Sequence, residues 1–173
     1  VFDGRTGEWE AEIAETGKRG GTLRCLTRTR ELQPPPDLWL LFAPIKKART
    51  DFIVEKGVEL GASRLCPVLT EFTNSERVNR ERLQAHAVEA AEQCGATVVP
   101  EVLAPMRLGS WLAQWPAERR LMVCDEARAG RADALPDLPG PWAILVGPEG
   151  GLSEAERARL GALPQAVPVA LGP

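Results

Sequence analysis

The sequence lacks several features that would assign it to a class at once. It has no apolar run near the roughly 20 residues that a membrane-spanning helix needs and no charged-then-apolar stretch at its start. We therefore expect a cytoplasmic protein with no membrane segment. Its cysteines are scattered and form no C-x-x-C pair: they are Cys25, Cys66, Cys94 and Cys124. This spacing argues against a zinc site or a disulfide scaffold, so we expect reduced core thiols and no metal.

Three common catalytic or nucleotide-binding motifs are missing as well. There is no G-x-x-x-x-G-K-[ST] loop and no G-x-G-x-x-G, which disfavours the usual phosphate- and dinucleotide-binding sites. There is no G-x-S-x-G elbow, so a serine hydrolase would have to use the only histidine, His86. Because His86 lies in the middle of a predicted helix near its apolar stripe, we interpret it as a partly buried structural residue. An unrelated hydrolase or nucleotide-binding enzyme stays as an alternative, which saturable binding of ATP or NAD would support.

The composition that remains is that of a soluble globular protein. Of the 173 residues, 44% are hydrophobic and 26% are charged, and the length suits one domain, or one domain with part of a second. The formal net charge is −3, which excludes a globally basic nucleic-acid coat but leaves room for a local basic face. The chain starts at Val1 rather than Met, and we expect further residues before it.

Residues 1–30 have the pattern of a β-hairpin. Residues 9–14 alternate apolar and charged side chains, which is typical of a half-buried strand, and residues 22–27 form a second candidate. About 30 residues of hairpin cannot bury a core alone, so we predict the end of a small β domain. In residues 31–37 (ELQPPPD), three consecutive prolines favour a stiff, extended connector.

From residue 38 onward, apolar runs alternate with helical patterns. We expect strands at about 38–43, 64–69, 98–99, 121–124, 143–146 and 167–171, and helices at about 48–60, 80–94, 108–115 and 154–163. Asn79 and Gly95 are the expected caps of the second helix. The alternation predicts an α/β domain with a mostly parallel sheet. Ligands bind such sheets beyond the carboxyl ends of the strands, which points to residues 125–131, 147–151 and whatever follows Leu171.

The most informative stretch is 144–153, ILVGPEGGLS. A strand runs into residues 147–151 (GPEGG), and Ser153 with Glu156 forms the capping box of the next helix. Three glycines in five residues permit unusual backbone angles and let N–H groups approach a ligand closely. A plain strand-to-helix turn explains the same residues and stays open. Residues 169–173 (VALGP) repeat the strand-to-glycine pattern, and we expect the chain to continue beyond them.

Several charged or aromatic residues have two interpretations each. Two basic clusters lie at predicted helix starts: Lys46, Lys47 and Arg49, and then Arg77, Arg80 and Arg82. Each cluster could contact phosphates, or be a solvated helix end diluted by acidic neighbours. Asp125 and Glu126 could do acid–base chemistry, or form a polar loop. Trp111 and Trp115, four residues apart, most simply anchor a helix to the core.

Four segments, in order, resemble the RsmE family of ribosomal RNA methyltransferases, which methylate N3 of one uridine in 16S ribosomal RNA. They are VFDGRTGEWEAEIAET (1–16), KKARTDFIVEKGVELG (46–61), NSERVNRERLQAHAVEAAEQCG with VPE (74–95 and 99–101), and LVGPEGGLSEAE with VALGP (145–156 and 169–173). The resemblance implies the C-terminal part of an RNA-binding PUA-like β domain over 1–30, a Pro-rich linker over 31–37, and a SPOUT-type methyltransferase domain over 38–173. In that fold the C-terminal part forms a deep trefoil knot, whose end would lie beyond Pro173.

The resemblance also implies S-adenosyl-L-methionine as methyl donor, a homodimer, and 16S ribosomal RNA in the small ribosomal subunit as partner. It places the donor against three loops: Val146, Gly147, Pro148, Glu149, Gly150 and Gly151; Leu171 and Gly172; and Cys124, Asp125 and Glu126. As catalytic residues we expect Glu149 as the base and Lys56 or Arg49 as the charge that stabilises the uracil anion. As RNA-binding residues we expect Lys46, Lys47, Arg77 and Arg80.

The sequence departs from the family pattern at Phe72 and Ala96, where the family usually has basic residues. Both changes weaken the expectation that those loops contact RNA. They support an alternative in which the protein kept the SPOUT fold as a non-catalytic RNA-binding or ribosome-assembly factor. Binding of S-adenosylmethionine would separate the two, because a pure binding module need not take up the donor.

Overall fold

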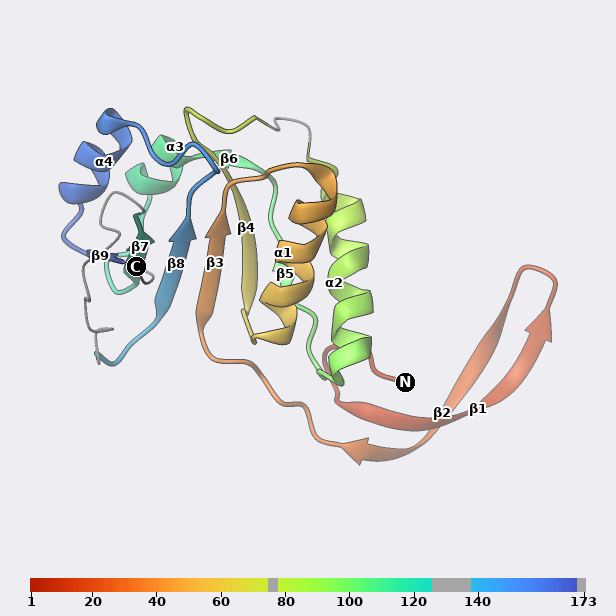
Figure 1. Ribbon diagram of the computed structural model, residues 1–173. Helices are drawn as coiled ribbons and strands as arrows, with labels where there is room; N and C mark the ends of the chain where they lie inside the picture. Colours follow the sequence, from red (N-terminus) through yellow and green to blue (C-terminus); the bar gives the residue numbers. More distant parts are fainter. Residues whose placement is uncertain (75–77, 126–137, 171–173) are drawn as a thin grey trace.

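The computed structural model describes residues 1–74, 78–125 and 138–170 (Figure 1). The strands are β1 (Glu8–Gly17), β2 (Gly20–Arg30), β3 (Leu38–Phe42), β4 (Arg64–Leu69), β5 (Glu101–Val102), β6 (Met106–Arg107), β7 (Arg120–Cys124), β8 (Trp142–Val146) and β9 (Ala166–Val169). The helices are α1 (Lys47–Glu59), α2 (Arg80–Cys94), α3 (Leu108–Ala113) and α4 (Glu154–Gly161).

The strands after β2 form one seven-stranded sheet, ordered β5-β4-β3-β8-β7-β9, with β6 also paired to β4. Each pairing in it is parallel, so the predicted α/β class with a mostly parallel sheet is confirmed. β8 lies between β3 and β7, and in register Val146 faces both Phe42 and Cys124. Because the strands run in the same direction, their carboxyl ends meet at one edge of the sheet.

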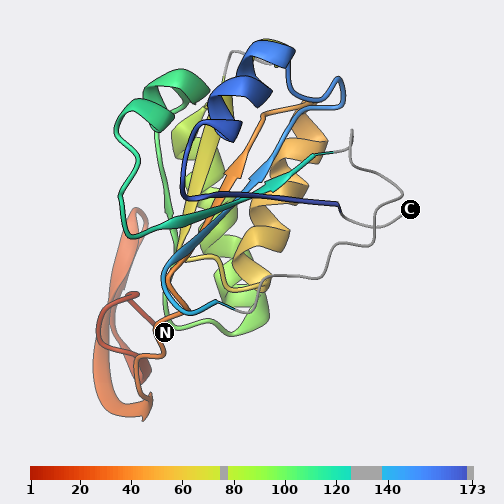
Figure 2. The same ribbon diagram turned by 90° about the vertical axis from the view of Figure 1, so that its left-hand side faces the viewer.

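Helices cover both faces of the sheet (Figures 1 and 2). Successive side chains of a strand point to opposite faces, so Phe42 packs with Val54 of α1 and Leu83 of α2, whereas Leu41 packs with Trp111 of α3 and its neighbours. Burying one such side chain contributes about 1.5–3 kcal/mol. The two apolar clusters therefore fix the sheet between two helical layers, and the predicted role of Trp111 as an anchor is confirmed.

Local capping signals set the helix ends. The Asn79 side chain accepts a hydrogen bond from the backbone N–H of Arg82 at 2.8 Å, and Gly95 ends α2 with a left-handed φ of 68°. Both caps were predicted. α4 is shorter than predicted and ends at Gly161. The strand expected at residues 98–99 is absent there, and pairing with β4 starts at Glu101 instead.

The β1–β2 hairpin is more exposed than its sequence pattern predicts. Its strands pair antiparallel, but Ile13 is 69% exposed and Leu23 is 51% exposed. The prediction of a half-buried strand holds at Trp9 and Ala11, which are partly buried, and fails from Ile13 onward, because no described element covers that part of the hairpin. Only its base is tied to the sheet domain: Arg30 donates to the carbonyl oxygen of Gly95 at 2.8 Å.

The cysteines are free thiols in two environments. Cys66 is buried, and burial raises the pKa of its thiol to about 12; burial also raises the pKa of Cys124. Cys25 and Cys94 are exposed, so the expectation of four core thiols is wrong for these two. Both lie on surfaces, one on the uncovered hairpin and one at the end of α2.

A buried arginine closes the amino-terminal edge of the sheet. Arg119, 6% exposed, donates to both carboxylate oxygens of Asp37 at 2.8 and 2.9 Å and to the carbonyl oxygen of Trp142 at 2.9 Å. Its guanidinium carbon lies 3.7 Å from the ring centroid of Trp39. A guanidinium suits such a position because it combines forked hydrogen bonds with stacking on an aromatic ring. Arg119 thus joins the end of the proline connector to the starts of β3 and β8.

Candidate functional site

The strand ends that the sequence singles out lie side by side. Cys124 at the end of β7 is in register with Val146 at the end of β8 and with Val169 at the end of β9. The backbone N–H of Asp125 donates to the carbonyl oxygen of Val169 at 3.3 Å. The three predicted donor loops therefore leave the sheet from three adjacent strands. Of the residues expected in those loops, Glu126, Leu171 and Gly172 lie outside the described residues.

Residues 147–151 form a tight turn between β8 and α4, which we call the glycine loop. The N–H of Gly151 donates to the carbonyl oxygen of Pro148 at 2.9 Å, and Gly151 has a φ of 71°, which favours glycine over other residues. Gly150 is exposed, and a Cβ on it would lie 3.5 Å from the Cβ of Phe72. Because glycine has no side chain, the backbone of this loop is accessible at the carboxyl edge of the sheet.

Glu156 connects α4 to the loop after β4. Its Oε2 atom accepts from the N–H of Ser153 at 3.0 Å, which completes the predicted capping box. Its Oε1 atom accepts from the N–H of Glu71 at 2.9 Å. The side chain is 9% exposed, so both bonds are shielded from water. The sequence predicts the first bond from local spacing, but the second joins residues 85 positions apart and has no sequence signal.

Two of the three expected catalytic side chains meet. Arg49, in the first turn of α1, donates to Glu149 of the glycine loop. Their side chains are 66% and 55% exposed, so solvent screens the pair and its contribution to stability is small. Lys56 is not part of this contact. It donates to Glu59, and the bonds to Glu59 and Glu55 raise the pKa of its ammonium group, which keeps Lys56 a cation rather than a base.

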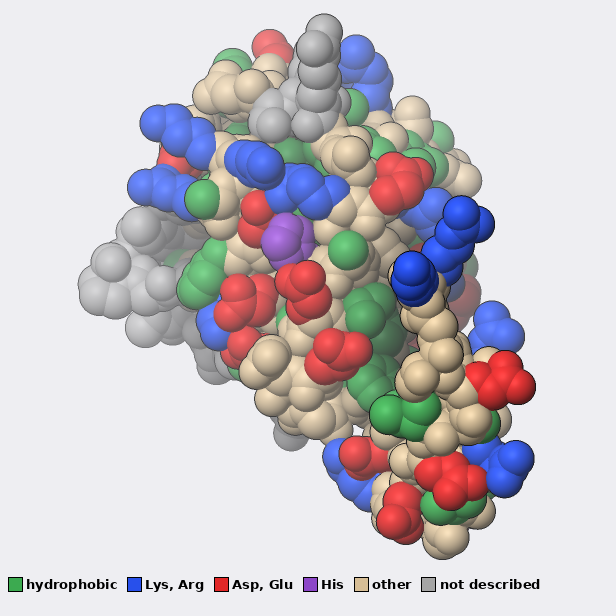
Figure 3. Space-filling model, turned by 90° about the vertical axis from the view of Figure 1, so that its right-hand side faces the viewer, with side chains coloured by type: hydrophobic (Ala, Val, Ile, Leu, Met, Phe, Trp, Pro, Cys, Tyr) green, Lys and Arg blue, Asp and Glu red, His purple; other side chains and the backbone are tan. Residues whose placement is uncertain are grey.

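Lys and Arg side chains gather on the upper part of the face that carries α1 and α2, and Asp and Glu side chains lie below them (Figure 3). Lys46 and Lys47 are exposed at the start of α1 and have no ion-pair partner among the described residues. Arg80 instead donates to the carbonyl oxygen of Val102 at 2.7 Å, and Arg82 pairs with Asp51. Basic side chains thus gather on this face, but its arginines are partly engaged within the protein. Arg77 lies outside the described residues.

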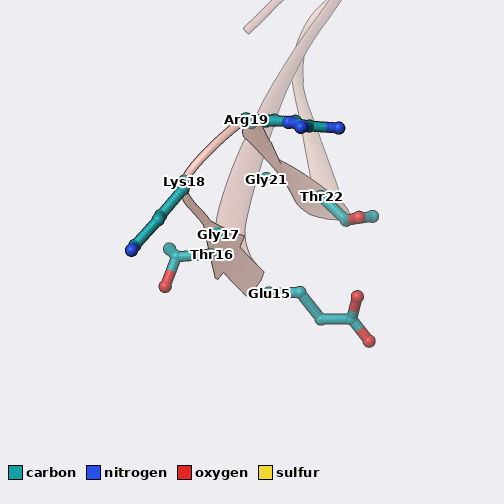
Figure 4. A pocket seen from close by; sticks show the side chains of 8 residues that line it. Glu15, Thr16, Gly17, Lys18, Arg19, Gly21 and Thr22 are labelled. Atoms are coloured by element: carbon teal, nitrogen blue, oxygen red, sulfur yellow. The ribbon is translucent and has the colours of Figure 1, made fainter.

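The remaining polar candidates have structural partners. Arg157 of α4 donates to Asp125 at 3.3 Å, and the Asp125 side chain is only 13% exposed. His86 is 36% exposed in its side chain and lies 3.7 Å from Asp51, which confirms the expectation of a partly buried histidine. At the hairpin tip, the side chains of Lys18 and Arg19 point in different directions (Figure 4), so the two cations do not converge on one point of the hollow there.

Neither a metal site nor a membrane span emerges from the part of the chain that the structure describes. No three His, Cys, Asp or Glu side chains in residues 1–74, 78–125 and 138–170 are grouped to hold a metal ion. Over the same ranges, no helix has the length and apolarity to cross a bilayer.

Comparison with known proteins gives a consistent assignment. A family model described as RNA methyltransferase domain matches residues 33–173. Ribosomal RNA small subunit methyltransferase E of Rickettsia conorii is 24% identical, over 99% of this chain and 71% of the relative. The protein of the same name from Synechocystis sp. is 29% identical, over 90% of this chain and 54% of the relative. The chain thus spans about half to three quarters of the length of these curated relatives.

A solved structure agrees with these relatives. The ribosomal RNA small subunit methyltransferase E of Neisseria gonorrhoeae, bound to S-adenosyl methionine, superposes with a TM-score of 0.87 at 26% identity, over 99% of this chain and 74% of that chain. Because the family model matches most of the chain, the chain belongs to the RNA methyltransferase domain family. Within this family, the resemblance to RsmE that the sequence predicts is confirmed, since all three relatives carry that enzyme's name.

Proposed function

We propose that the protein transfers a methyl group from S-adenosylmethionine to N3 of a specific uridine in 16S ribosomal RNA of the small ribosomal subunit. The observation that carries this proposal is the register of Cys124, Val146 and Val169. Because these strand ends lie side by side, the three loops expected to hold the donor all begin at the same edge of the sheet. The named relatives support the same reaction class and the same RNA. Ligands of parallel α/β sheets bind at this carboxyl edge.

The residues at this edge fit the donor. Gly150 is exposed, Val146 is 38% exposed, and the glycines of the loop bring backbone N–H groups within reach of polar atoms without side-chain obstruction. Val146 to Gly151 would hold the donor from one side and Cys124 and Asp125 from another. When bound, S-adenosylmethionine supplies a methyl group on a sulfonium, and the electron pair of the breaking C–S bond stays on sulfur as the N3–C bond forms.

The chain's own residues would position the uracil and handle its proton. Uracil N3 carries a proton that must leave for its electron pair to attack, so a base and a nearby cation both favour the reaction. Glu149 would accept the proton. Arg49, which Glu149 already contacts, would stabilise the negative charge that develops on the uracil. Arg49 is better placed for this than Lys56, whose ammonium group donates to carboxylates on its own helix. Alignment of the reacting atoms supplies much of the remaining acceleration.

RNA would approach across the basic side chains that border the glycine loop. Lys46, Lys47 and Arg80 stand at the N-terminal ends of α1 and α2, close to the same edge of the sheet (Figures 1 and 3). Phosphate contacts from such side chains make binding salt-dependent. We also propose that residues 1–30 are the end of a PUA-like RNA-binding domain. The exposed β1–β2 hairpin supports this, because it offers a surface that no described element covers.

The same resemblance leads us to propose a deep trefoil knot, a homodimer and a cytoplasmic location. The strand order supports the knot. After β8 and α4 the chain returns to the far side of β7 to form β9. From this position, a segment that follows β9 could pass through a preceding loop and form the knot. Sedimentation and subunit cross-linking of the full-length protein would test the dimer directly.

The test is methyl transfer from labelled S-adenosylmethionine into small ribosomal subunits that lack the modification, followed by nucleoside digestion and mass analysis. We expect N3-methyluridine at one position. Arg49→Gln should lower the rate with little change in donor affinity, and Arg64→Gln, at the opposite edge of the sheet, is the matched control. Donor binding without transfer would contradict the catalytic assignment, whereas a lack of both would favour the RNA-binding alternative. Absence of donor binding would contradict the proposed function as a whole.

A further inference from the structure

A pocket is lined by residues of α3, α4 and the end of β4. The helices α3 and α4 lie on the face of the sheet opposite α1 and α2 (Figure 2). The polar side chains in the lining of the pocket are those of Glu71, Arg107, Ser110, Glu156 and Arg159. It belongs neither to the glycine loop nor to the basic face of α1 and α2. The pocket opens near the carboxyl edge of the sheet, because β4 ends at Leu69 just before it.

The two arginines line this pocket without a direct ion-pair partner in the described residues. Arg107 immediately precedes α3, and the Nη1 atom of Arg159 lies 3.0 Å from the position that a Cβ would take on Gly109. Both arginines are exposed, and within the described residues neither guanidinium has an ion-pair or hydrogen-bond partner. In this they differ from the arginines at the starts of α1 and α2, each of which is paired.

The two carboxylates of the lining form no ion pair with either arginine in the described residues. Both oxygens of Glu156 instead accept backbone hydrogen bonds, from Glu71 and from Ser153. The helix dipole explains a cation such as Arg159 in the last turn of α4. It does not explain Arg107, which precedes a helix and so stands where a cation is disfavoured.

We propose that this pocket binds a phosphodiester group of the RNA through Arg107 and Arg159, with the hydroxyl of Ser110 as a further donor. The proposal rests on RNA being the substrate, as proposed above. Guanidinium groups match the forked geometry of phosphate oxygens and stay charged at any working pH. One phosphate facing two such groups would supply the direct ion-pair partner that neither arginine has among the described residues.

The position of the pocket connects it to the reaction site. The N–H of Glu71, on the rim of the pocket, donates to Glu156 at 2.9 Å. The Cβ of the next residue, Phe72, lies 3.5 Å from the position that a Cβ would take on Gly150 of the glycine loop. An RNA strand whose target nucleotide lies at the glycine loop would thus have a neighbouring phosphate within reach of the pocket. The basic face at the start of α1 would contact the strand on the other side of the loop. RNA would therefore be gripped on both sides of the modified base.

The experiment measures affinity for a short fluorescein-labelled single-stranded RNA by anisotropy at salt concentrations between about 50 and 200 mM. For the double variant Arg107→Ala/Arg159→Ala we expect about tenfold weaker binding and a salt slope shallower by roughly 0.7, the value for one single-strand phosphate contact. The double variant Arg107→Lys/Arg159→Lys should restore the slope. The matched control is Arg64→Ala/Arg120→Ala, which removes the same charge at the amino ends of β4 and β7.

An unchanged salt slope in Arg107→Ala/Arg159→Ala, or an equal change in the control, would overturn the proposal. The proposal would also be overturned if inorganic phosphate bound to the pocket while the variant bound RNA with unchanged affinity, because the pocket would then be a site for free anions. Affinity for S-adenosylmethionine, measured in parallel by calorimetry, should be the same in all variants. If methyl transfer is absent while the slope still depends on the two arginines, the phosphate site stands and only the proposed reaction falls.

Discussion

Gly150 is the residue of the glycine loop at which a side chain would matter most. A Cβ there would make only ordinary contact with Phe72, at 3.5 Å, so the loop should keep its conformation when Gly150 is replaced. The branches of valine, however, would occupy the accessible side of the backbone. We expect Gly150→Val to weaken S-adenosylmethionine binding at least about tenfold, which is about 1.4 kcal/mol, by calorimetry.

The control for Gly150→Val is Gly161→Val, where nothing lies within 4 Å of the added Cβ. It should bind the donor as the unmodified protein does, and thermal unfolding should show both variants folded. Donor affinity that is unchanged in Gly150→Val would remove the glycine loop from the donor site.

The buried thiol of Cys66 makes the free energy of unfolding depend on pH in the alkaline range. Burial raises the pKa of its thiol from the ordinary 9.0 to about 12, while the charges of Arg64 and Arg119 oppose the shift. The folded protein therefore keeps a proton that the unfolded chain loses. The stabilisation is complete below pH 9 and is lost as the pH rises from 9 toward 12.

The free energy of unfolding should therefore fall above about pH 9, by at most about 1.4 kcal/mol per pH unit from this group. Urea unfolding across that range, in the unmodified protein and in Cys66→Ala, measures it. The variant loses a constant amount through packing, but the difference between the two should shrink as the pH rises. A difference that does not vary with pH would contradict the assignment.

At the scale of elements, Glu156 joins α4 to the loop that follows β4. Removing its carboxylate leaves the N–H groups of Glu71 and Ser153 without acceptors in a shielded position. An unsatisfied buried group costs about 1–3 kcal/mol, so we expect Glu156→Ala to lower the free energy of unfolding by about 2–4 kcal/mol. Ser153→Ala, which removes only the cap, should cost about 1 kcal/mol.

Urea denaturation of the two variants, with Glu156→Gln as a conservative substitution, checks this ranking. The amide of Gln keeps one acceptor oxygen, so its cost should fall between the other two. Equal costs for Glu156→Ala and Ser153→Ala would mean that the bond to Glu71 adds nothing.

Elements with local signals are the ones that sequence predicts well. The ends of α2 depend on Asn79 and Gly95, which act within one turn, and both were predicted. The short strand β5 depends on pairing with β4, which is 37 residues away at Arg64 and Glu101, and its position was predicted wrongly. The Arg49–Glu149 pair spans 100 positions and has no local signal either. The resemblance places Glu149 at the donor, and the chemistry of the uracil anion suggests Arg49, but neither could show that the two residues touch.

Across the whole molecule, stability is distributed unevenly. β3 and β8 are central in the sheet and lie under helices on both faces, whereas the β1–β2 hairpin is a two-stranded ribbon open to solvent. Segments with few buried contacts open at lower free energy than the core. Hydrogen exchange followed by mass spectrometry should show amides of the hairpin exchanging well before those of β3 and β8. Equal protection of both would mean that something covers the hairpin in solution.

The proline connector is held at both of its ends. Near β2, Gln33 donates to Thr97 at 2.8 Å and Arg30 to Gly95; near β3, Asp37 is clasped by the buried Arg119. The base of the hairpin therefore cannot swing freely about the sheet domain. If both parts contact the same RNA, the distance between the two contact surfaces is fixed before the RNA binds. The protein would then select RNA by the spacing of its two contact points, and an RNA with the correct nucleotide but the wrong spacing would bind poorly.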